Sequence, residues 1–435
     1  MTKVVPNLRK NLKVQRPLLS LILCATFTLT GCGINTAASE SPSPNPAVTI
    51  KEPVSTATPI ATSISIEKDP IALKMAKMTL EDKIGQMLLV GIEGTVLDPS
   101  AKRMISEDKV GGIILYGDNI SNLQGMVKLI NNLKVTNKNN PAPLFISVDE
   151  EGGKVSRMPK EFVTIPSNRT VGNTNNARLA QTMGELLGRE LTLTGFNMNF
   201  APVLDVNSNA QNPIIGNRSF GSSAARVTKM GLAEIKGLRS EGIIPVVKHY
   251  PGHGDTSVDS HLELPVVNKT EQQLAKLEWI PFQAAIKDKA EAVMVAHILF
   301  PKLDPNKPAS LSKVIIGEHL RGEMGYKGVV ITDDLTMGAI MKHYKLAEAA
   351  IDTIKAGSDI LLIAHGYDNE KLVLNKIKQS VNNGTISESR IDESVRRILS
   401  LKSKYKLSDN KPVSVPNLTS LNQDIRSWRL EVQNK

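Results

Sequence analysis

The sequence predicts an α/β protein of the (β/α)8 barrel type, built as a single domain with enlarged loops. Three observations support this prediction. Eight short apolar runs rich in β-branched residues recur within residues 69–407, helical patterns separate them, and polar side chains gather at the ends of five runs. Continuous apolar strands that alternate with helices indicate a parallel sheet covered on both faces. Eight such units with polar strand ends are typical of a barrel.

The eight predicted strands follow one another in order along the chain. They read IGQMLLVG (84–91), GGIILYG (111–117), APLFISVD (142–149), FNMNFAPVLDV (196–206), IPVVKHY (244–250), EAVMVAHI (291–298), GVVITDD (328–334) and SDILLIA (358–364). A doubly wound open sheet is the structural alternative, but no glycine-rich phosphate fingerprint follows the first strand. We therefore expect a barrel.

The segments between the strands carry signals for the start and end of helices. Thr270 and Gln273 form a capping box ahead of an apolar pattern that runs from Leu274 to Ile286. Gly357 stands where a helix that starts near residue 346 has to end before the last strand. Helices at these places would cover the outside of the sheet.

The first 31 residues have the pattern of a secretory signal. A basic segment precedes the apolar run PLLSLILCATFTL, which is shorter than the roughly 20 apolar residues needed to span a bilayer. The run ends in LTGC at positions 29–32, which resembles the bacterial lipobox. In that motif Cys32 would become the lipidated first residue. An ordinary signal peptide with an incidental cysteine is the alternative.

Two segments flank the predicted barrel. Residues 32–68 are dominated by Ser, Thr, Pro and Ala without apolar periodicity, which predicts a disordered stalk behind the lipidated cysteine. Residues 408–435 are too few for a further domain, and we expect a C-terminal tail. These features predict a protein held by its lipid at the extracellular face of a bacterial cell membrane, with residues 69–407 as its folded part.

The charge of the chain does not indicate a nucleic-acid partner. The formal net charge is +10, but five basic residues lie at the extreme N-terminus, and without them 48 basic face 43 acidic residues. The rest of the chain has no dense Lys/Arg tract and few aromatic residues to stack on bases. Of the two cysteines, Cys24 would leave with the signal, so we expect no intramolecular disulfide.

The segment KHYPGHGDTSVDSHLELP (248–265) holds three of the seven histidines. One interpretation is a metal site, but Pro251, Gly252 and Gly254 forbid the helix that would stack His249 and His253 as zinc ligands. A polar turn is a second interpretation, yet a lysine and a histidine directly follow the apolar pair VV at the end of a strand. A catalytic loop of a barrel enzyme is the third interpretation.

This segment resembles the signature of glycoside hydrolase family 3, in its β-N-acetylglucosaminidase branch. Three further segments are similar to that family and occur in its order: VDEEGGKVSR (148–157), APVLDVN with NPIIGNRSFG (201–221), and GVVITDDLTMGAI (328–340). The resemblance covers most of residues 70–400. The sequence departs from the branch at two positions. Glu150 stands where glutamine is usual, and Lys154 stands where arginine is usual.

The resemblance implies a role for each matching residue. Asp333 would be the nucleophile, His261 the general acid and base, and Asp259 the residue that orients the imidazole. The terminal sugar would be bound by Asp149, Arg157, Arg218, Lys248 and His249.

These roles agree with the chemistry of the residue types. A carboxylate nucleophile has to stay ionised, and we expect Lys248 and Arg218 to lower its pKa. A helix N-cap is the structural alternative for Asp333, although Asp334 fits that task better. An imidazole with a pKa near 6.5 can give and take a proton in one cycle. His297 would either line the pocket or form a bond to the backbone in the core.

The resemblance therefore implies a retaining exo-β-N-acetylglucosaminidase that needs no cofactor and no metal. Its partners would be GlcNAc-containing saccharides or muropeptides from peptidoglycan and, through its anchor, the membrane; we expect a monomer. The alternatives within the family are a β-glucosidase or β-xylosidase, and a phosphorylase in which phosphate replaces water. A lipoprotein that only binds the cell wall is the alternative outside catalysis, but such a protein has no need of both Asp333 and His261.

Overall fold

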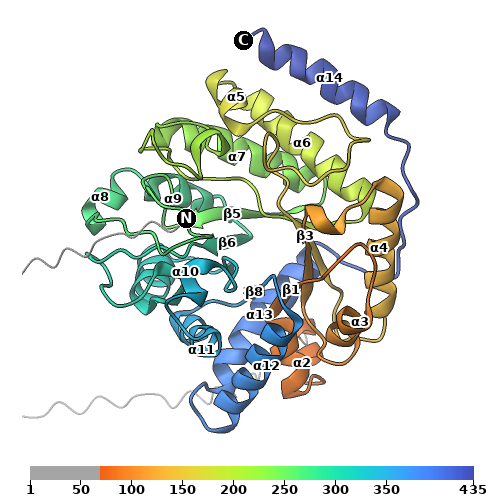
Figure 1. The fold of residues 1–435 in the computed structure, drawn as a ribbon, viewed down its shortest axis with the longest axis vertical. Helices are drawn as coiled ribbons and strands as arrows, with labels where there is room; N and C mark the ends of the chain where they lie inside the picture. The colour runs from red at the N-terminus through yellow and green to blue at the C-terminus, as the bar shows by residue number, and fades with distance from the viewer. Residues whose placement is uncertain (1–68) are drawn as a thin grey trace, which may run out of the picture. The chain divides into compact units, whose positions relative to one another are not determined.

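The computed structural model describes residues 69–435, which form a parallel eight-stranded barrel surrounded by helices (Figure 1). The predicted signal, lipobox and stalk lie outside the described residues. The strands are β1 Leu88–Gly91, β2 Gly112–Leu115, β3 Phe145–Val148, β4 Met198–Asn199, β5 Ile244–Tyr250, β6 Ala292–Val295, β7 Val329–Thr332 and β8 Leu361–Ile363. All eight predicted strands are present, so the predicted fold class is confirmed.

Strands that are neighbours in the sequence are also neighbours in the sheet, and β8 pairs with β1. A parallel bridge between Ile331 and Ile360 joins β7 to the residues before β8 and completes the ring. Every strand residue is buried. This burial on both faces explains why the strands appear in the sequence as continuous apolar runs.

The helices cover the outer face of the sheet. Their bounds are α1 Pro70–Met75, α2 Leu80–Gln86, α3 Pro99–Ser106, α4 Leu123–Thr136, α5 Asn168–Asn173, α6 Ala177–Thr194, α7 Ala224–Ser240, α8 Glu271–Ala275, α9 Trp279–Lys287, the π-helix η4 Lys313–Glu323, α10 Gly338–Met341, α11 Leu346–Ala356, α12 Tyr367–Asn382, α13 Glu388–Lys404 and α14 Thr419–Gln433. No helix within residues 69–435 has both the length and the apolar character needed to cross a membrane.

Some of the predicted boundaries are wrong. The fourth strand, predicted for residues 196–206, is limited to Met198–Asn199. The predicted first strand begins too early, because a capping box of Thr79 and Asp82 starts α2, which runs to Gln86. A short apolar run cannot be assigned to a strand or a buried helix by its composition. The capping box at Thr270 is confirmed, but the helix behind it is divided into α8 and α9. The predicted end of α11 at Gly357 is confirmed, and this glycine has a φ of 121°.

The predicted C-terminal tail is also wrong, because residues 419–433 form helix α14. This helix packs on α6 at the edge of the barrel (Figure 1). Its apolar side chains recur with helical spacing, and all are buried: Leu421, Ile425, Trp428 and Val432. The indole of Trp428 donates a hydrogen bond to the carbonyl oxygen of Leu179, at 3.2 Å. The segment is therefore part of the folded unit.

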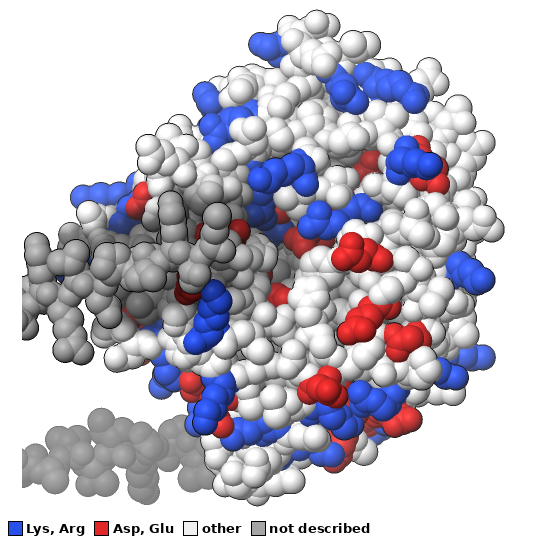
Figure 2. Space-filling view, in the orientation of Figure 1, with Lys and Arg blue, Asp and Glu red and all other residues white. Residues whose placement is uncertain are grey.

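Charged side chains of both signs are interspersed on the face of the molecule drawn in Figure 2. No continuous field of Lys and Arg covers the described part of that face. This distribution agrees with the small surplus of basic over acidic residues that the sequence shows outside its N-terminus.

Candidate active site

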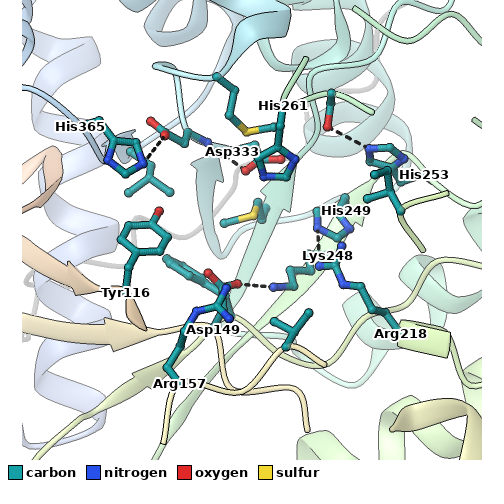
Figure 3. Close-up of a pocket in the computed structure, with 18 residues that line it drawn as sticks. Tyr116, Asp149, Arg157, Arg218, Lys248, His249, His253, His261, Asp333 and His365 are labelled. Carbon is teal, nitrogen blue, oxygen red and sulfur yellow. Dashed lines mark hydrogen bonds and ion pairs between the residues drawn. The ribbon is translucent and has the colours of Figure 1, made fainter. Parts of the chain in front are cut away.

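A cavity of about 350 Å³ opens at the carboxyl ends of the barrel strands. Seven of the residues predicted from the sequence border it: Asp149, Arg157, Arg218, Lys248, His249, His261 and Asp333 (Figure 3). They come from the ends of β3, β5 and β7 and from the loops that follow β3, β4 and β5. The barrel thus brings together side chains that lie up to 184 positions apart in the sequence.

The floor of the cavity is a network of ion pairs. Lys248, at 1% exposure of its side chain, forms ion pairs with Asp149 and, at 2.7 Å, with Glu151. The guanidinium of Arg218 donates two hydrogen bonds to Glu151, of 2.8 and 2.7 Å. Burial alone would raise the pKa of Glu151, but Arg218 and Lys248 outweigh it and hold this pKa well below its usual range. The network therefore fixes two cations that face the cavity.

Glu151 was not predicted as a site residue. A signal was present in the sequence, because Glu151 follows Asp149 at the end of a predicted strand. Its position in the sequence does not reveal its partners Arg218 and Lys248, which lie 67 and 97 residues further along the chain.

Asp205 orients the histidines next to Lys248. Its carboxylate, with no exposed side-chain surface, lies 2.7 Å from Nδ1 of His249 and accepts a 2.6 Å hydrogen bond from the amide of His253. Burial would raise the pKa of Asp205, but His249 and His253 leave it lowered. The register of β5 against β6 shifts between Val247 and Tyr250. Lys248 and His249 are both in the cavity wall, although they are adjacent in a strand.

Asp333 lies directly after β7, at the centre of the cavity wall. Its amide donates a 2.9 Å hydrogen bond to Val295, and its Oδ1 accepts one of 2.9 Å from the amide of Asp334. Burial would raise the pKa of Asp333, but His297, His249 and the Asp334 amide lower it below its usual value. The carboxylate is therefore ionised at neutral pH, as a nucleophile has to be.

The expected cause of this lowered pKa is wrong. Lys248 and Arg218 were expected to lower it, but their charges are compensated by Asp149 and Glu151. Histidines and a backbone amide act on Asp333 instead.

The two neighbours of Asp333 that the sequence singled out have structural roles. Oδ1 of Asp334 accepts hydrogen bonds of 2.9 Å from the amides of Thr336 and Ala364, and so ties the turn after β7 to the end of β8. His297 is fully buried and is bonded to Ser310 Oγ at 2.6 Å and to the carbonyl oxygen of Asp334 at 2.9 Å. Of the two roles considered for His297, the structure supports the core histidine.

His261 and Asp259 form a pair on the loop above the cavity. Nδ1 of His261 lies 2.8 Å from Oδ1 of Asp259, which also accepts a 2.9 Å hydrogen bond from the His261 amide. The side chain of His261 is 65% exposed, and its ring borders the cavity with Asp333 (Figure 3). The amide of Gly338 donates a 3.2 Å hydrogen bond to the His261 carbonyl. An ionised carboxylate and a carboxylate-oriented imidazole thus border one cavity, which suits nucleophilic and acid–base chemistry.

Two aromatic rings on the opposite wall were missed by the sequence interpretation. Tyr116 follows β2 and His365 follows β8, and their rings stack with centroids 5.4 Å apart and an angle of 28° between planes (Figure 3). Nε2 of His365 lies 3.9 Å from Asp334. His365 comes directly after a predicted apolar strand and Tyr116 lies near the end of another, so the rule that places site residues at strand ends could have found them.

The three histidines of the 248–265 segment have different partners. His249 contacts Asp205, His253 contacts Thr256 and Ser260, and His261 contacts Asp259. Among residues 69–435, the one group of at least three His, Cys, Asp or Glu side chains whose ligand atoms lie within 4.8 Å of one another is elsewhere, at Glu271, His319 and Glu323. The geometry of the segment therefore gives no support to the metal interpretation.

Comparisons with known proteins identify the family of this chain. The family model described as the glycosyl hydrolase family 3 N terminal domain matches residues 79–401. Beta-hexosaminidase A of Pseudoalteromonas piscicida is 34% identical over 363 residues, which are 78% of this chain and 60% of that protein. Beta-hexosaminidase LpqI of Mycobacterium tuberculosis is 33% identical over 356 residues, which are 80% of this chain and 89% of that protein.

A solved structure is similar as well. The glycoside hydrolase family 3 β-N-acetylglucosaminidase from Paenibacillus sp. str. FPU-7 has 39% sequence identity and a TM-score of 0.76, and the match covers 81% of this chain and 68% of that one. The chain spans less than two thirds of the length of the Pseudoalteromonas relative and most of the length of LpqI. The family match extends over more than half of the chain, and the chain therefore belongs to glycosyl hydrolase family 3.

Proposed function

We propose that this chain is a retaining exo-β-N-acetylglucosaminidase, which hydrolyses terminal non-reducing β-linked N-acetylglucosamine. The observation that carries the proposal is the ionised carboxylate of Asp333 and the His261–Asp259 pair on the border of one cavity. The names of the relatives support the sugar, because two are beta-hexosaminidases and the Paenibacillus structure is a β-N-acetylglucosaminidase.

In the proposed reaction Asp333 attacks the anomeric carbon while the bond from that carbon to the leaving oxygen breaks. His261 gives its proton to this oxygen, and a covalent glycosyl-aspartate forms. Water then gives a proton to His261 and attacks the same carbon, which releases Asp333 and restores both residues. Two inversions retain the β-configuration. Asp259 stabilises the charged imidazole and sets its tautomer, like the aspartate of a catalytic triad.

The floor network would hold the terminal sugar. The carboxylate of Asp149 can accept hydrogen bonds from sugar hydroxyls, and Lys248, Arg218 and Arg157 can donate them. Because Glu151 fixes Arg218 and Lys248, these donors lose little conformational freedom when the sugar binds.

One experiment tests both the sugar and the stereochemistry. We expect the purified chain to cleave 4-nitrophenyl β-N-acetylglucosaminide faster than the β-glucoside and β-xyloside, and ¹H NMR to show the β-anomer as the first product. We expect Asp333→Ala to be inactive on all leaving groups, because no leaving group can replace the nucleophile. A faster reaction with the glucoside would contradict the sugar assignment, and a first α-anomer would exclude Asp333 as nucleophile.

Phosphorolysis is a second candidate activity, since a structural neighbour with 25% identity and a TM-score of 0.74 is a beta-glucoside phosphorylase BglX. A histidine does not repel phosphate as a second carboxylate would. The same reactions with and without phosphate separate the two activities. We expect free N-acetylglucosamine in both, and sugar 1-phosphate as main product would replace hydrolysis by phosphorolysis.

We further propose that the natural substrates are peptidoglycan fragments and that Cys32 carries a lipid which holds the protein at the membrane. The support is the LTGC motif behind an apolar run. We expect the mature protein to partition with membranes and Cys32→Ser to release it. A wild-type chain found wholly in the aqueous fraction would contradict the anchor but not the glycosidase.

A further inference from the structure

Glu150 is a buried carboxylate in the loop after β3, directly after the cavity residue Asp149, with 1% of its surface exposed. Its backbone is fixed to β4, because its amide donates a 3.0 Å hydrogen bond to Asn199 and its carbonyl accepts one of 2.8 Å from the same side chain. Its Oε2 accepts hydrogen bonds from the amides of Arg157, at 2.6 Å, and Met158, at 3.2 Å. Glu150 therefore joins the two ends of the loop between residues 150 and 158.

The loop between these ends is a tight hairpin. Gly152 and Val155 form an antiparallel bridge, and the amide of Glu151 donates a 2.8 Å hydrogen bond to the Val155 carbonyl. The hairpin fixes residues up to Val155, and the bonds to Glu150 fix the chain at Arg157. The side chain of Arg157 then borders the cavity (Figure 3).

Arg157 differs from the other cations of the cavity in how it is held. Arg218 and Lys248 are each restrained by carboxylates at their charged ends. Within residues 69–435, the guanidinium of Arg157 has one hydrogen bond, a long contact of 3.5 Å to the carbonyl of Ser156, and no carboxylate within ion-pair distance. Its position thus depends on its backbone, and Glu150 holds that backbone.

We propose that Glu150 is a positioning residue for substrate binding, which holds the 150–158 loop through its carboxylate and thereby places Arg157 at the sugar. This inference rests on the proposed function only in that the cavity binds a sugar. It assigns a task to one of the two positions at which the sequence departs from the β-N-acetylglucosaminidase branch, the one where glutamine is usual. Either residue offers a side-chain oxygen to the two amides, but only glutamate titrates.

The charge on Glu150 changes near neutral pH. Burial raises its pKa to about 7, against the lowering effect of the Arg157 and Met158 amides, of Ser156 and of the Arg157 charge. From α6, the buried carboxyl of Glu190 faces it; burial and Glu150 raise the pKa of Glu190 well above its usual value. Ionised Glu150 accepts stronger, charge-assisted hydrogen bonds, so the loop is held more firmly above pH 7.

The test compares Glu150→Gln, Glu150→Ala and the control Glu190→Gln, using whichever nitrophenyl glycoside the wild-type enzyme cleaves best. The outcome for Glu150 then does not depend on which sugar the enzyme prefers. For Glu150→Ala we expect KM to rise by about tenfold, as for the loss of two hydrogen bonds to the loop, and kcat to change much less. For Glu150→Gln we expect KM to stay within about threefold of wild type, because the acceptor is retained.

The pH profile and a double variant complete the test. In the wild type and in Glu190→Gln we expect KM to fall as pH rises through 7, and in Glu150→Gln we expect this step to vanish. When Arg157 is already replaced by Ala, Glu150→Ala is expected to raise KM no further. Glu150 acts on the sugar through Arg157, so the effects of the two substitutions on KM do not add. An unchanged step in Glu150→Gln, or a full additional increase in the double variant, would overturn the proposal. Thermal unfolding of each variant verifies that it is folded.

Discussion

The contact between Gly338 and the loop that holds His261 offers a way to displace His261 without changing it. Gly338 is the first residue of α10, and its amide is bonded to the His261 carbonyl. A Cβ at position 338 would lie 2.5 Å from the carbonyl oxygen of His261 and 2.9 Å from that of Leu262. Both atoms belong to the backbone, so no side-chain rotation can relieve the clash.

The size of the effect follows from this geometry. Ordinary contacts of a Cβ begin at 3.4 Å, so in Gly338→Ala the loop has to retreat by about 1 Å. A misplacement of that size can cost ~10²-fold in rate. We expect this loss where the leaving group needs a proton, as in the disaccharide of N-acetylglucosamine. A 4-nitrophenyl leaving group needs little acid catalysis, and we expect its first step to lose less than about fivefold.

The assay compares kcat/KM for the disaccharide and the nitrophenyl glycoside in the wild type, in Gly338→Ala and in Gly117→Ala. Gly117 is a matched control next to the cavity, because a Cβ there would meet only the side chain of Arg157, at 3.9 Å. We expect the control to behave like the wild type on both substrates. Equal losses of Gly338→Ala on both substrates, or no loss on the disaccharide, would refute the assignment of His261 as the proton donor.

Two further predictions concern stability. Burial lowers the pKa of Lys402 to about 7, so the unfolded chain binds more protons between pH 7 and about 10, and the free energy of unfolding contains a part that rises with pH by about 1.4 kcal/mol per unit. Lys402→Met is expected to remove this rise, which denaturant unfolding at several pH values measures; an unchanged slope would contradict it. Trp428→Ala is expected to destabilise the protein by about 3–5 kcal/mol because α14 loses its buried anchor, whereas the control Leu430→Ala, at a position 61% exposed, is expected to change little. If α14 were dispensable, thermal unfolding of both variants would match the wild type.

Most of the fold could be predicted from the sequence because its signals are local. Most strands lie in apolar runs whose burial is set by their own residues, and helix ends such as Gly357 are marked by residues with special backbone preferences. The boundaries that failed lie where local signals overlap. At residues 84–87 an apolar run belongs to a helix, and at 419–433 a helical apolar pattern was too short to stand out beside the prolines before it.

Part of the candidate site could likewise be predicted from the sequence, and part could not. The resemblance to glycoside hydrolase family 3 implied Asp333, His261 and Lys248 as site residues. Each also stands at a strand end or in a loop after a strand, and barrel folds bring such positions together. The pair of Asp259 and His261 could also be predicted, because two residues of separation let a carboxylate reach an imidazole. The sequence by itself determined which chemical groups meet.

Only the tertiary structure decided which groups pair with which. Glu151 forms ion pairs with Arg218 and Lys248, and histidines rather than these cations act on Asp333. The Glu150 side chain accepts a hydrogen bond from the amide of Arg157 and so closes the 150–158 loop. The physical reason is that ion pairs and hydrogen bonds form only within a few ångströms. Those distances depend on strand register and loop path across segments that are far apart in the sequence.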